Sequence, residues 1–267
     1  AGRANTTGNH NTAIGYQAGR NNTIATGCVF VGTNAGSGNT TGNDNIAIGL
    51  NTLTGNTSGT QNIAIGANAL AVNTVTGNTA LGYRAGSGIT IGANNTCIGY
   101  VAGSGLTTGV NNTVIGNNAQ ASAATITGEI TLGNANVVAL RCQVTTITSL
   151  SDARDKDQIE DIPFGYDFLK KIRPVKFVWN TRDGVVVGSK AIGFIAQELD
   201  QVETEFNSEE YTKLVYKPNP DKWEATPGNL FPIAIKSIQQ IAQNLNSLND
   251  QLLQMVPGWT TPSGWVV

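Results

Sequence analysis

Lysine is absent from the first 150 residues of this chain, and the whole sequence of 267 residues contains one histidine, His10, and three cysteines. The net charge is -2 and no basic stripe appears, so nucleic acid is not an expected partner. Cys28, Cys97 and Cys142 are odd in number and widely spaced, which argues against a disulfide framework and against a metal site. We therefore expect no metal and no cofactor.

Long apolar runs are also missing. The sequence has no stretch long enough to cross a membrane and no signal peptide, so no membrane insertion is expected. The chain begins inside a repeat and without an initiator methionine, so we expect it to be the end of something longer.

Charge changes abruptly near residue 150. Six charged residues lie before this point and 28 lie in the 117 residues after it, together with all four tryptophans. Such a shift predicts two parts, a polar repeat array over residues 1–150 and an ordinary globular segment over residues 151–267.

The first part repeats an apolar residue followed by glycine. The glycines of these pairs are 17 residues apart, except for one step of 16: Gly15, Gly32, Gly49, Gly66, Gly82, Gly99, Gly116 and Gly133. This period is too short for repeats built of helical pairs. A unit of this size cannot bury its apolar face alone, so the coils must stack. The pattern predicts a narrow trimeric β-solenoid or β-roll of about eight coils, with small Ile, Val and Ala residues facing inward.

Asparagine recurs four residues before most of these glycines, at Asn11, Asn45, Asn62, Asn78, Asn95 and Asn112. Stacked coils would place these side chains in register, where their amides can form ladders. Cys28 and Glu129 interrupt the ladder near its two ends.

Three functions of the array compete. Calcium-binding repeats need aspartates at fixed positions, and the array contains only Asp44. An ice-binding face has some support from recurring threonines, although they fall at two different offsets: Thr7, Thr26, Thr41, Thr76, Thr108 and Thr127. A stiff stalk or adhesive shaft is the default interpretation. In style and period the units are similar to the head repeats of trimeric surface adhesins and to the shafts of phage tail fibres.

The second part carries four ordered blocks. They are Ser151–Ile159, Tyr166–Leu169, Ile172–Trp179 and Gly193–Glu198, and a helical stretch over about 229–255 follows. Together they resemble the C-terminal intramolecular chaperone domain of phage endosialidases, tail fibres and tail spikes, also classified as a self-cleaving S74 peptidase. The resemblance implies an α+β chaperone domain and a cut between Leu150 and Ser151.

The resemblance also implies the chemistry of that cut. Ser151 would attack the carbonyl before it, giving an ester by an N-to-O acyl shift that water then hydrolyses. A serine needs a base to remove its proton. The distance of His10 along the sequence excludes a Ser-His-Asp triad within this segment. Lys156 is the natural candidate, because a lysine can act as the base when burial lowers its pKa.

Spacing constrains this pair. Five residues place two side chains about 140° apart on a helix and on opposite faces of a strand, so a turn between Ser151 and Lys156 is required. Asp152 and Asp155 are typical turn residues. Arg154 either positions the scissile carbonyl or pairs with a carboxylate. Glu198 either orients Lys156 or serves as a salt-bridge or helix-start carboxylate.

The helical stretch predicts an oligomer. Its apolar residues alternate steps of three and four, at Phe231, Ala234, Ile238, Ile241, Leu245, Leu248, Leu252 and Met255. This is the a/d seam of a coiled coil, and isoleucine at both positions favours three or more strands over two. The alternative is a single amphipathic helix that packs on its own domain. The tail with Trp259 and Trp265 would cap the bundle or contact a neighbour.

Joined together, the two parts predict the C-terminal part of a phage tail fibre, made in the host cytoplasm and located in the virion. A trimeriser at the C-terminus would fix the register of three chains, form a homotrimer and then cut itself off. The upstream fibre would bind a host receptor, glycan or protein. The alternative is a non-cleaving trimeric adhesin, and an ice-binding solenoid is the third choice.

Overall fold

The computed structural model describes residues 1–137, 139–141, 151–182, 184 and 186–262. The chain divides into two compact units, Ala1–Leu140 and Arg141–Val267. The predicted array extends ten residues further than the first unit, and residues 142–150 of that extension, Cys142 and Leu150 among them, lie outside the described residues, as does Trp265.

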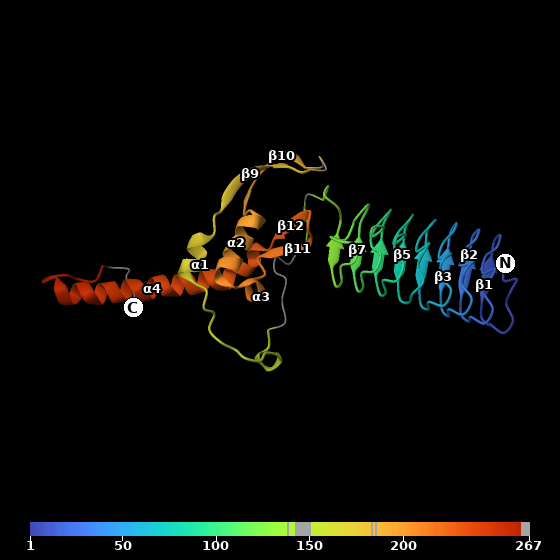
Figure 1. The fold of residues 1–267 in the computed structure, drawn as a ribbon, viewed down its shortest axis with the longest axis horizontal. Coiled ribbons are helices and arrows are strands. Elements are labelled where there is room, and N and C mark those ends of the chain that lie inside the picture. Colours follow the sequence, from blue (N-terminus) through green and yellow to red (C-terminus); the bar gives the residue numbers. More distant parts are fainter. Residues whose placement is uncertain (138, 142–150, 183, 185, 263–267) are drawn as a thin grey trace. The chain divides into compact units, whose positions relative to one another are not determined.

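The first unit is a β-solenoid of about seven turns over residues 12–132 (Figure 1). Its eight strands form one parallel sheet in the order of the sequence. The strands are β1 (Thr12–Ile14), β2 (Val29–Val31), β3 (Ile46–Ile48), β4 (Ile63–Ile65), β5 (Thr79–Leu81), β6 (Thr96–Ile98), β7 (Thr113–Ile115) and β8 (Ile130–Leu132). Neighbouring strands pair at a step of 17 residues, except where Ile63 pairs with Thr79. The period of the sequence is therefore the length of one coil.

Each strand has three residues, and only the middle one faces the interior. Ala47, Ala64 and Cys97 occupy this position and are completely buried, whereas Ile48 and Leu81, at the third position, are 37% and 45% exposed. Side chains alternate between the two faces of a strand, so the outer residues of a three-residue strand must point away from the core. The expectation that isoleucine faces inward is therefore wrong for these strands. The core is made by alanine, by the residues at strand centres and by leucines at the corners.

The glycine that follows each strand allows the coils to approach closely. Gly49 has a φ of +131°, and a Cβ atom added there would lie 2.9 Å from the carbonyl carbon of Gly66 in the next coil. Only glycine combines that backbone conformation with that contact.

The asparagine ladder runs inside the solenoid. The Oδ1 atom of Asn45 accepts hydrogen bonds from the backbone N and the Nδ2 of Asn62, at 3.0 and 3.1 Å. The same pattern links Asn95 to Asn112, and Asn62, Asn78 and Asn112 are at most 1% exposed. Buried amides are thus satisfied by the next coil, which ties neighbouring coils together along the axis.

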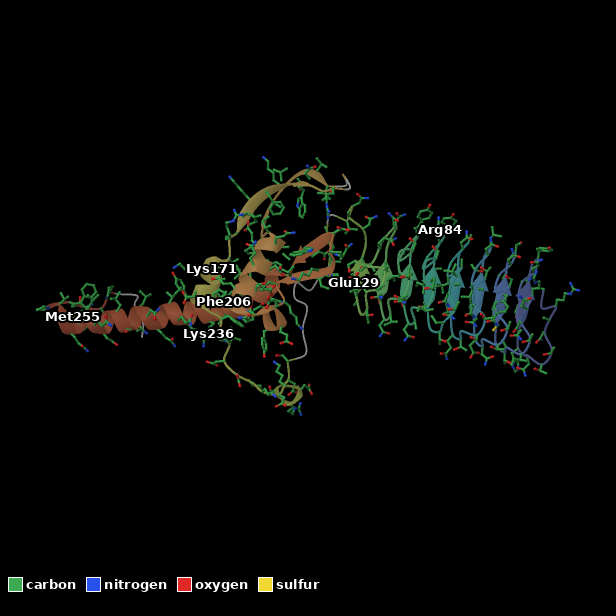
Figure 2. The ribbon with its side chains drawn as sticks, in the orientation of Figure 1. Arg84, Glu129, Lys171, Phe206, Lys236 and Met255 are labelled. Atoms are coloured by element: carbon green, nitrogen blue, oxygen red, sulfur yellow. The ribbon has the colours of Figure 1, made fainter. Side chains whose placement is uncertain are left out.

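Cys28 interrupts this ladder, as the sequence suggests. Its backbone N still donates to Asn11 Oδ1 at 2.9 Å, but its thiol cannot supply the amide that the other coils have. The Oδ1 atom of Asn22 is buried without a hydrogen-bond partner, and so is that of Asn56, whose coil carries Asn62. Asn39 Oδ1, at the equivalent place one coil after Asn22, accepts from Asn45 Nδ2. At the other end, Glu129, which is labelled in Figure 2, continues the backbone pattern. Its N–H donates to Asn112 Oδ1 at 2.9 Å.

The threonines considered for ice binding divide between two files of stacked residues. The hydrogen bonds between coils align Thr7 with Ile24 and Thr41, and Thr26 with Asn43 and Thr60. Neither file presents threonine in every coil. The six threonines therefore do not form a single regular file.

The second unit contains a small α+β region and a long helix. Its elements are η1 (Ala153–Asp155), α1 (Tyr166–Lys171), β9 (Val175–Asn180), β10 (Val187–Gly193), α2 (Ala196–Phe206), α3 (Glu209–Thr212), β11 (Val215–Asn219), β12 (Lys222–Ala225), η2 (Pro227–Asn229) and α4 (Leu230–Met255). The strands form two antiparallel hairpins, β9 with β10 and β11 with β12. Phe168, Leu199, Val202, Leu214, Leu230 and Ile233 form the buried core.

Helix α4 has two apolar faces. Leu230 and Ile233 pack into the core of the unit, whereas the predicted seam lies on another face and stays outside that core. Its members Ile238 and Leu248 are 62% and 47% exposed, and Met255, the last residue of α4, is 68% exposed (Figure 2). No helix within the described ranges is long and apolar enough to span a bilayer.

The tail after α4 folds back on the helix. Trp259 Nε1 donates to Asn249 Oδ1 at 3.2 Å, and Asn249 Nδ2 donates to Thr261 Oγ1 at 3.1 Å. Asn249 is 6% exposed. The tail is therefore fixed to the helix of its own chain at these residues.

Replacing Cys28 with asparagine should stabilise the array. The new amide would offer Asn22 a donor and would replace the weak sulfur acceptor of the Asn45 backbone N–H by an amide oxygen, which we expect to raise the free energy of unfolding by about 1–2 kcal/mol. Thermal unfolding followed by far-UV circular dichroism measures this change. Cys28→Ala is the matched control, and equal stability of the two variants would contradict this account of the ladder.

Candidate functional site

A short turn brings Ser151 and Lys156 together. Asp152 precedes η1, and its Oδ1 atom accepts a hydrogen bond from the backbone N of Arg154 at 2.9 Å. The backbone N of Lys156 then donates to Ala153 O at 3.3 Å. An aspartate that caps a tight turn in this way reverses the chain within a few residues. This is the turn that the spacing of the pair requires.

The two side chains are in contact across this turn. Lys156 Nζ donates a hydrogen bond to Ser151 Oγ at 2.7 Å. Both residues are exposed in the single chain. Leu150, whose carbonyl carbon would be attacked, lies outside the described residues. The amine of the candidate base is therefore hydrogen-bonded to the hydroxyl of the candidate nucleophile.

Arg154 pairs with Asp152 within the same turn. Its Nη2 atom lies 2.5 Å from Asp152 Oδ2, and its side chain is 88% exposed. The hydrogen bonds from Arg154 lower the pKa of the Asp152 carboxyl. The structure thus brings these two predicted residues together, next to Ser151 and Lys156.

Glu198 belongs to a different contact. It lies in the first turn of α2, and its Oε2 atom accepts a hydrogen bond from Arg173 Nε at 3.0 Å, while Arg173 Nη2 contacts Oε1. The hydrogen bonds from Arg173 lower the pKa of the Glu198 carboxyl. The structure brings Glu198 to Arg173 and not to Lys156.

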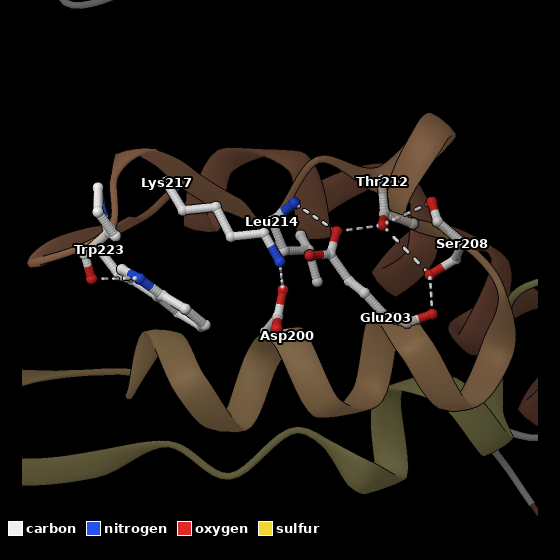
Figure 3. Close-up of polar contacts among 8 residues, drawn as sticks. Asp200, Glu203, Ser208, Thr212, Leu214, Lys217 and Trp223 are labelled. Atoms are coloured by element: carbon white, nitrogen blue, oxygen red, sulfur yellow. Dashed lines mark hydrogen bonds and ion pairs between the residues drawn. The ribbon is translucent and has the colours of Figure 1, made fainter. Parts of the chain in front are cut away.

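A buried glutamate, which the sequence did not single out, organises the end of α2. Glu203 is 2% exposed, and its Oε1 atom accepts hydrogen bonds from Leu214 N at 2.6 Å and from Thr212 Oγ1 at 2.5 Å (Figure 3). Its backbone O accepts from Ser208 N at 3.0 Å. One side chain thus joins α2, α3 and the start of β11. The signal available in the sequence is its helical spacing from Leu199, which places both on one face.

A charged contact lies at the surface between α2 and the β11–β12 hairpin. Lys217 Nζ pairs with Asp200 Oδ1 and lies 5.1 Å from the centroid of the Trp223 ring (Figure 3). Trp223 Nε1 in turn donates to Pro220 O at 3.2 Å. These contacts hold the β11–β12 hairpin against α2.

Among the described residues, no three His, Cys, Asp or Glu side chains come close enough to hold an ion. Burial raises the pKa of the Cys97 thiol to about 12, so this cysteine is a core residue and not a nucleophile.

Residues 151–209 match the family model described as Peptidase_S74, chaperone of endosialidase. The matched segment starts at Ser151 and runs through the turn, α1, the β9–β10 hairpin and α2. Searches of curated proteins and of solved structures found no match. The family model therefore matches about the first half of the second unit and none of the array.

Replacing Glu203 with alanine should destabilise the second unit. The backbone N–H of Leu214 would lose its buried acceptor, which we expect to cost about 1–3 kcal/mol of unfolding free energy. Urea unfolding followed by tryptophan fluorescence reports on this unit alone, because all four tryptophans follow residue 151.

Glu205→Ala is the matched control on the same helix. Glu205 pairs with Lys171 at the surface, with both side chains about half exposed, so its loss should cost less than about 1 kcal/mol. A cost for Glu203→Ala no greater than that of the control would contradict the organising role of Glu203.

Proposed function

We propose that residues 151–267 act as an intramolecular chaperone for the solenoid. The second unit assembles three chains, sets the register of their arrays and then leaves by cutting the Leu150–Ser151 bond. The trimeric array remains as part of a phage tail fibre in the virion, below an upstream segment that binds a host receptor, glycan or protein. The observation that carries this proposal is the family match that begins at Ser151.

Assembly rests on the exposed seam of α4. Ile238, Ile241 and Leu245 are 62%, 41% and 42% exposed, although the helix already packs another face on its own core. A row of a and d residues left in water is typical of a helix that pairs with other helices. Three copies would bury the seam, and isoleucine at both positions favours that number over two.

The array itself gives a reason for such an assembler. Its strands repeat at a nearly constant step and carry the same residue types, so a chain displaced by one coil meets almost the same contacts as a chain in register. Contacts that are this similar cannot select one register. A trimeriser at one end of the array supplies the missing information.

The cut follows from the Ser151–Lys156 pair. The neutral amine of Lys156 takes the proton of the Ser151 hydroxyl, and Oγ attacks the carbonyl carbon of Leu150. The C–N bond breaks as the leaving nitrogen takes a proton, which leaves an ester on Oγ. Water then hydrolyses this ester, giving a new carboxylate at Leu150 and restoring the hydroxyl of Ser151, whose amine was freed in the preceding step.

Exposure of the pair suggests when the cut occurs. A lysine acts as a base once burial favours its neutral form, and Lys156 is exposed in the single chain. Neighbouring chains that cover the turn in the trimer would supply this burial. Cleavage would therefore follow assembly, and the released array would be held by its packing alone.

Ser151→Ala should prevent the cut, because the attacking oxygen is removed. Lys156→Met should prevent it as well, since methionine keeps the length of the side chain but cannot accept a proton. Intact-mass spectrometry of freshly purified protein measures the outcome, and uncut protein has a mass of 27.8 kDa. Glu198→Gln is the control, and we expect it to be cut like the wild type.

A wild-type protein that stays at full mass would instead favour a permanent, non-cleaving trimeriser of an adhesin. Cutting of Ser151→Ala at the wild-type rate would exclude the serine mechanism.

Ile241→Lys should prevent assembly, because a charge in the centre of the seam cannot be buried without a partner. The uncut Ser151→Ala protein should sediment as a trimer, and the double variant as a monomer. Gln243→Lys places the same charge on an exposed position of the same helix and should leave the trimer intact. A trimer that persists in Ile241→Lys would rule out the seam as the contact.

A further inference from the structure

The outward-facing side of the solenoid sheet, here called the outer sheet face, carries no charge in any of its eight coils. It consists of two columns of side chains, from the first and third residues of each strand. The first column is Thr12, Val29, Ile46, Ile63, Thr79, Thr96, Thr113 and Ile130, and the third-residue column is Ile14, Val31, Ile48, Ile65, Leu81, Ile98, Ile115 and Leu132. Twelve of these sixteen side chains are apolar.

Much of this face is in contact with water. Ile14 is 60% exposed, Ile115 is 37% exposed and Leu132 is 54% exposed, so the exposure extends over the whole length of the array. Soluble monomers rarely expose a continuous apolar patch that is larger than a few hundred Å². Eight strands extend over roughly 34 Å, and two columns of side chains are about 12 Å wide, which gives a footprint of about 400 Å².

Polar threonine side chains lie elsewhere on the same coils. Thr40, Thr74 and Thr90 donate their hydroxyl protons to carbonyl oxygens of the next coil, at 2.9 Å for Thr74 and 2.8 Å for Thr40. Polar side chains of this kind remain hydrated without cost. Exposed apolar side chains also occur elsewhere on the coils, Ile24, Leu50 and Ile91 among them, whereas the third-residue column of the outer sheet face is apolar in every strand.

We propose that the outer sheet face is the surface through which copies of this chain pack on one another. The occupant of the face is the same face of the other two copies, with the three chains parallel around a common axis. The third-residue column, which is apolar in every coil, lies at the centre of the contact. The first column, with its four threonines, lies toward the rim, where hydroxyls remain hydrated. This inference rests on the proposed trimer.

Two features of the face favour a second copy over an unrelated partner. A parallel copy presents its columns at the same spacing as the strands, about 4.8 Å, so apolar side chains meet at every level. The area also fits. In the uncut chain the seam of α4, about 39 Å long, adds roughly 400 Å² to the face of the array, and together they reach the 800 Å² or so per partner that a stable interface buries. After the cut only the face of the array remains, and the rate at which it opens would limit its dissociation.

A cysteine in place of Ile48 tests this arrangement in the full-length chain. The uncut Ser151→Ala protein with Cys142→Ser is used for all variants, because Cys28 and Cys97 are buried. Ile48→Cys should react with a maleimide at least about ten-fold more slowly than Thr57→Cys, an exposed position of the neighbouring coil. A thiol in a packed interface reacts only when the contact opens. Both variants should react equally in denaturant.

Leu81→Cys, from the same column, provides a second position and should be protected in the same way. Sedimentation of each variant shows whether it is a trimer, independently of how fast its thiol reacts. Trimers in which the thiols at 48 and 81 react as fast as the thiol at 57 would overturn the proposed interface and leave the trimer standing. Monomers with reactive thiols would overturn both.

Discussion

Each coil of the solenoid is held by the next coil, and the rest of the molecule depends on this constraint. Asn62 bonds to Asn45 and Ile63 pairs with Ile46, and the same contacts repeat at nearly every step. A repeated contact builds a continuous solenoid from short strands. It also leaves only one side chain per strand for the core, which places isoleucine and leucine on the outside, and it makes every register nearly equivalent. The apolar outer surface and the near equivalence of different registers thus have a single cause.

The second unit has two properties that suit it to setting the register of the array: an irregular core and a free helical seam. Its core is irregular, with Phe168 packed edge-on against Phe206 and Glu203 buried under α3 and β11, so it has one way to fold. Helix α4 uses Leu230 and Ile233 for that core and keeps a separate seam free. A unit that folds uniquely and then associates through such a seam can place three repetitive chains at the same height. In the proposed assembly, arrays that have packed together would separate at a rate set by unfolding rather than by the continued presence of the unit.

The sequence predicted the features that follow from the 17-residue period. It missed the features that depend on contacts between distant parts of the chain. The step of 17 residues gave the coils, the asparagine ladder and its break at Cys28, because each of these follows from stacking like on like. The direction of the isoleucines was wrong, since a strand of three residues turns its centre inward and the period alone does not say which residue is the centre. Glu203 was missed because its value comes from Leu214 and Thr212, which reach it only in the fold. The spacing of Ser151 and Lys156 required a turn between them. Asp152 caps that turn, and the two side chains are in contact across it.

The central claim is that the array needs the second unit to assemble and does not need it afterwards. Residues 1–150 made alone, and the same residues released from the full-length chain, have one covalent structure and differ only in history. Sedimentation of the two preparations tests the claim most directly. The account predicts a trimer from the full-length chain and monomers or aggregates from the array made alone. An array that forms the same trimer without ever having carried residues 151–267 would contradict it.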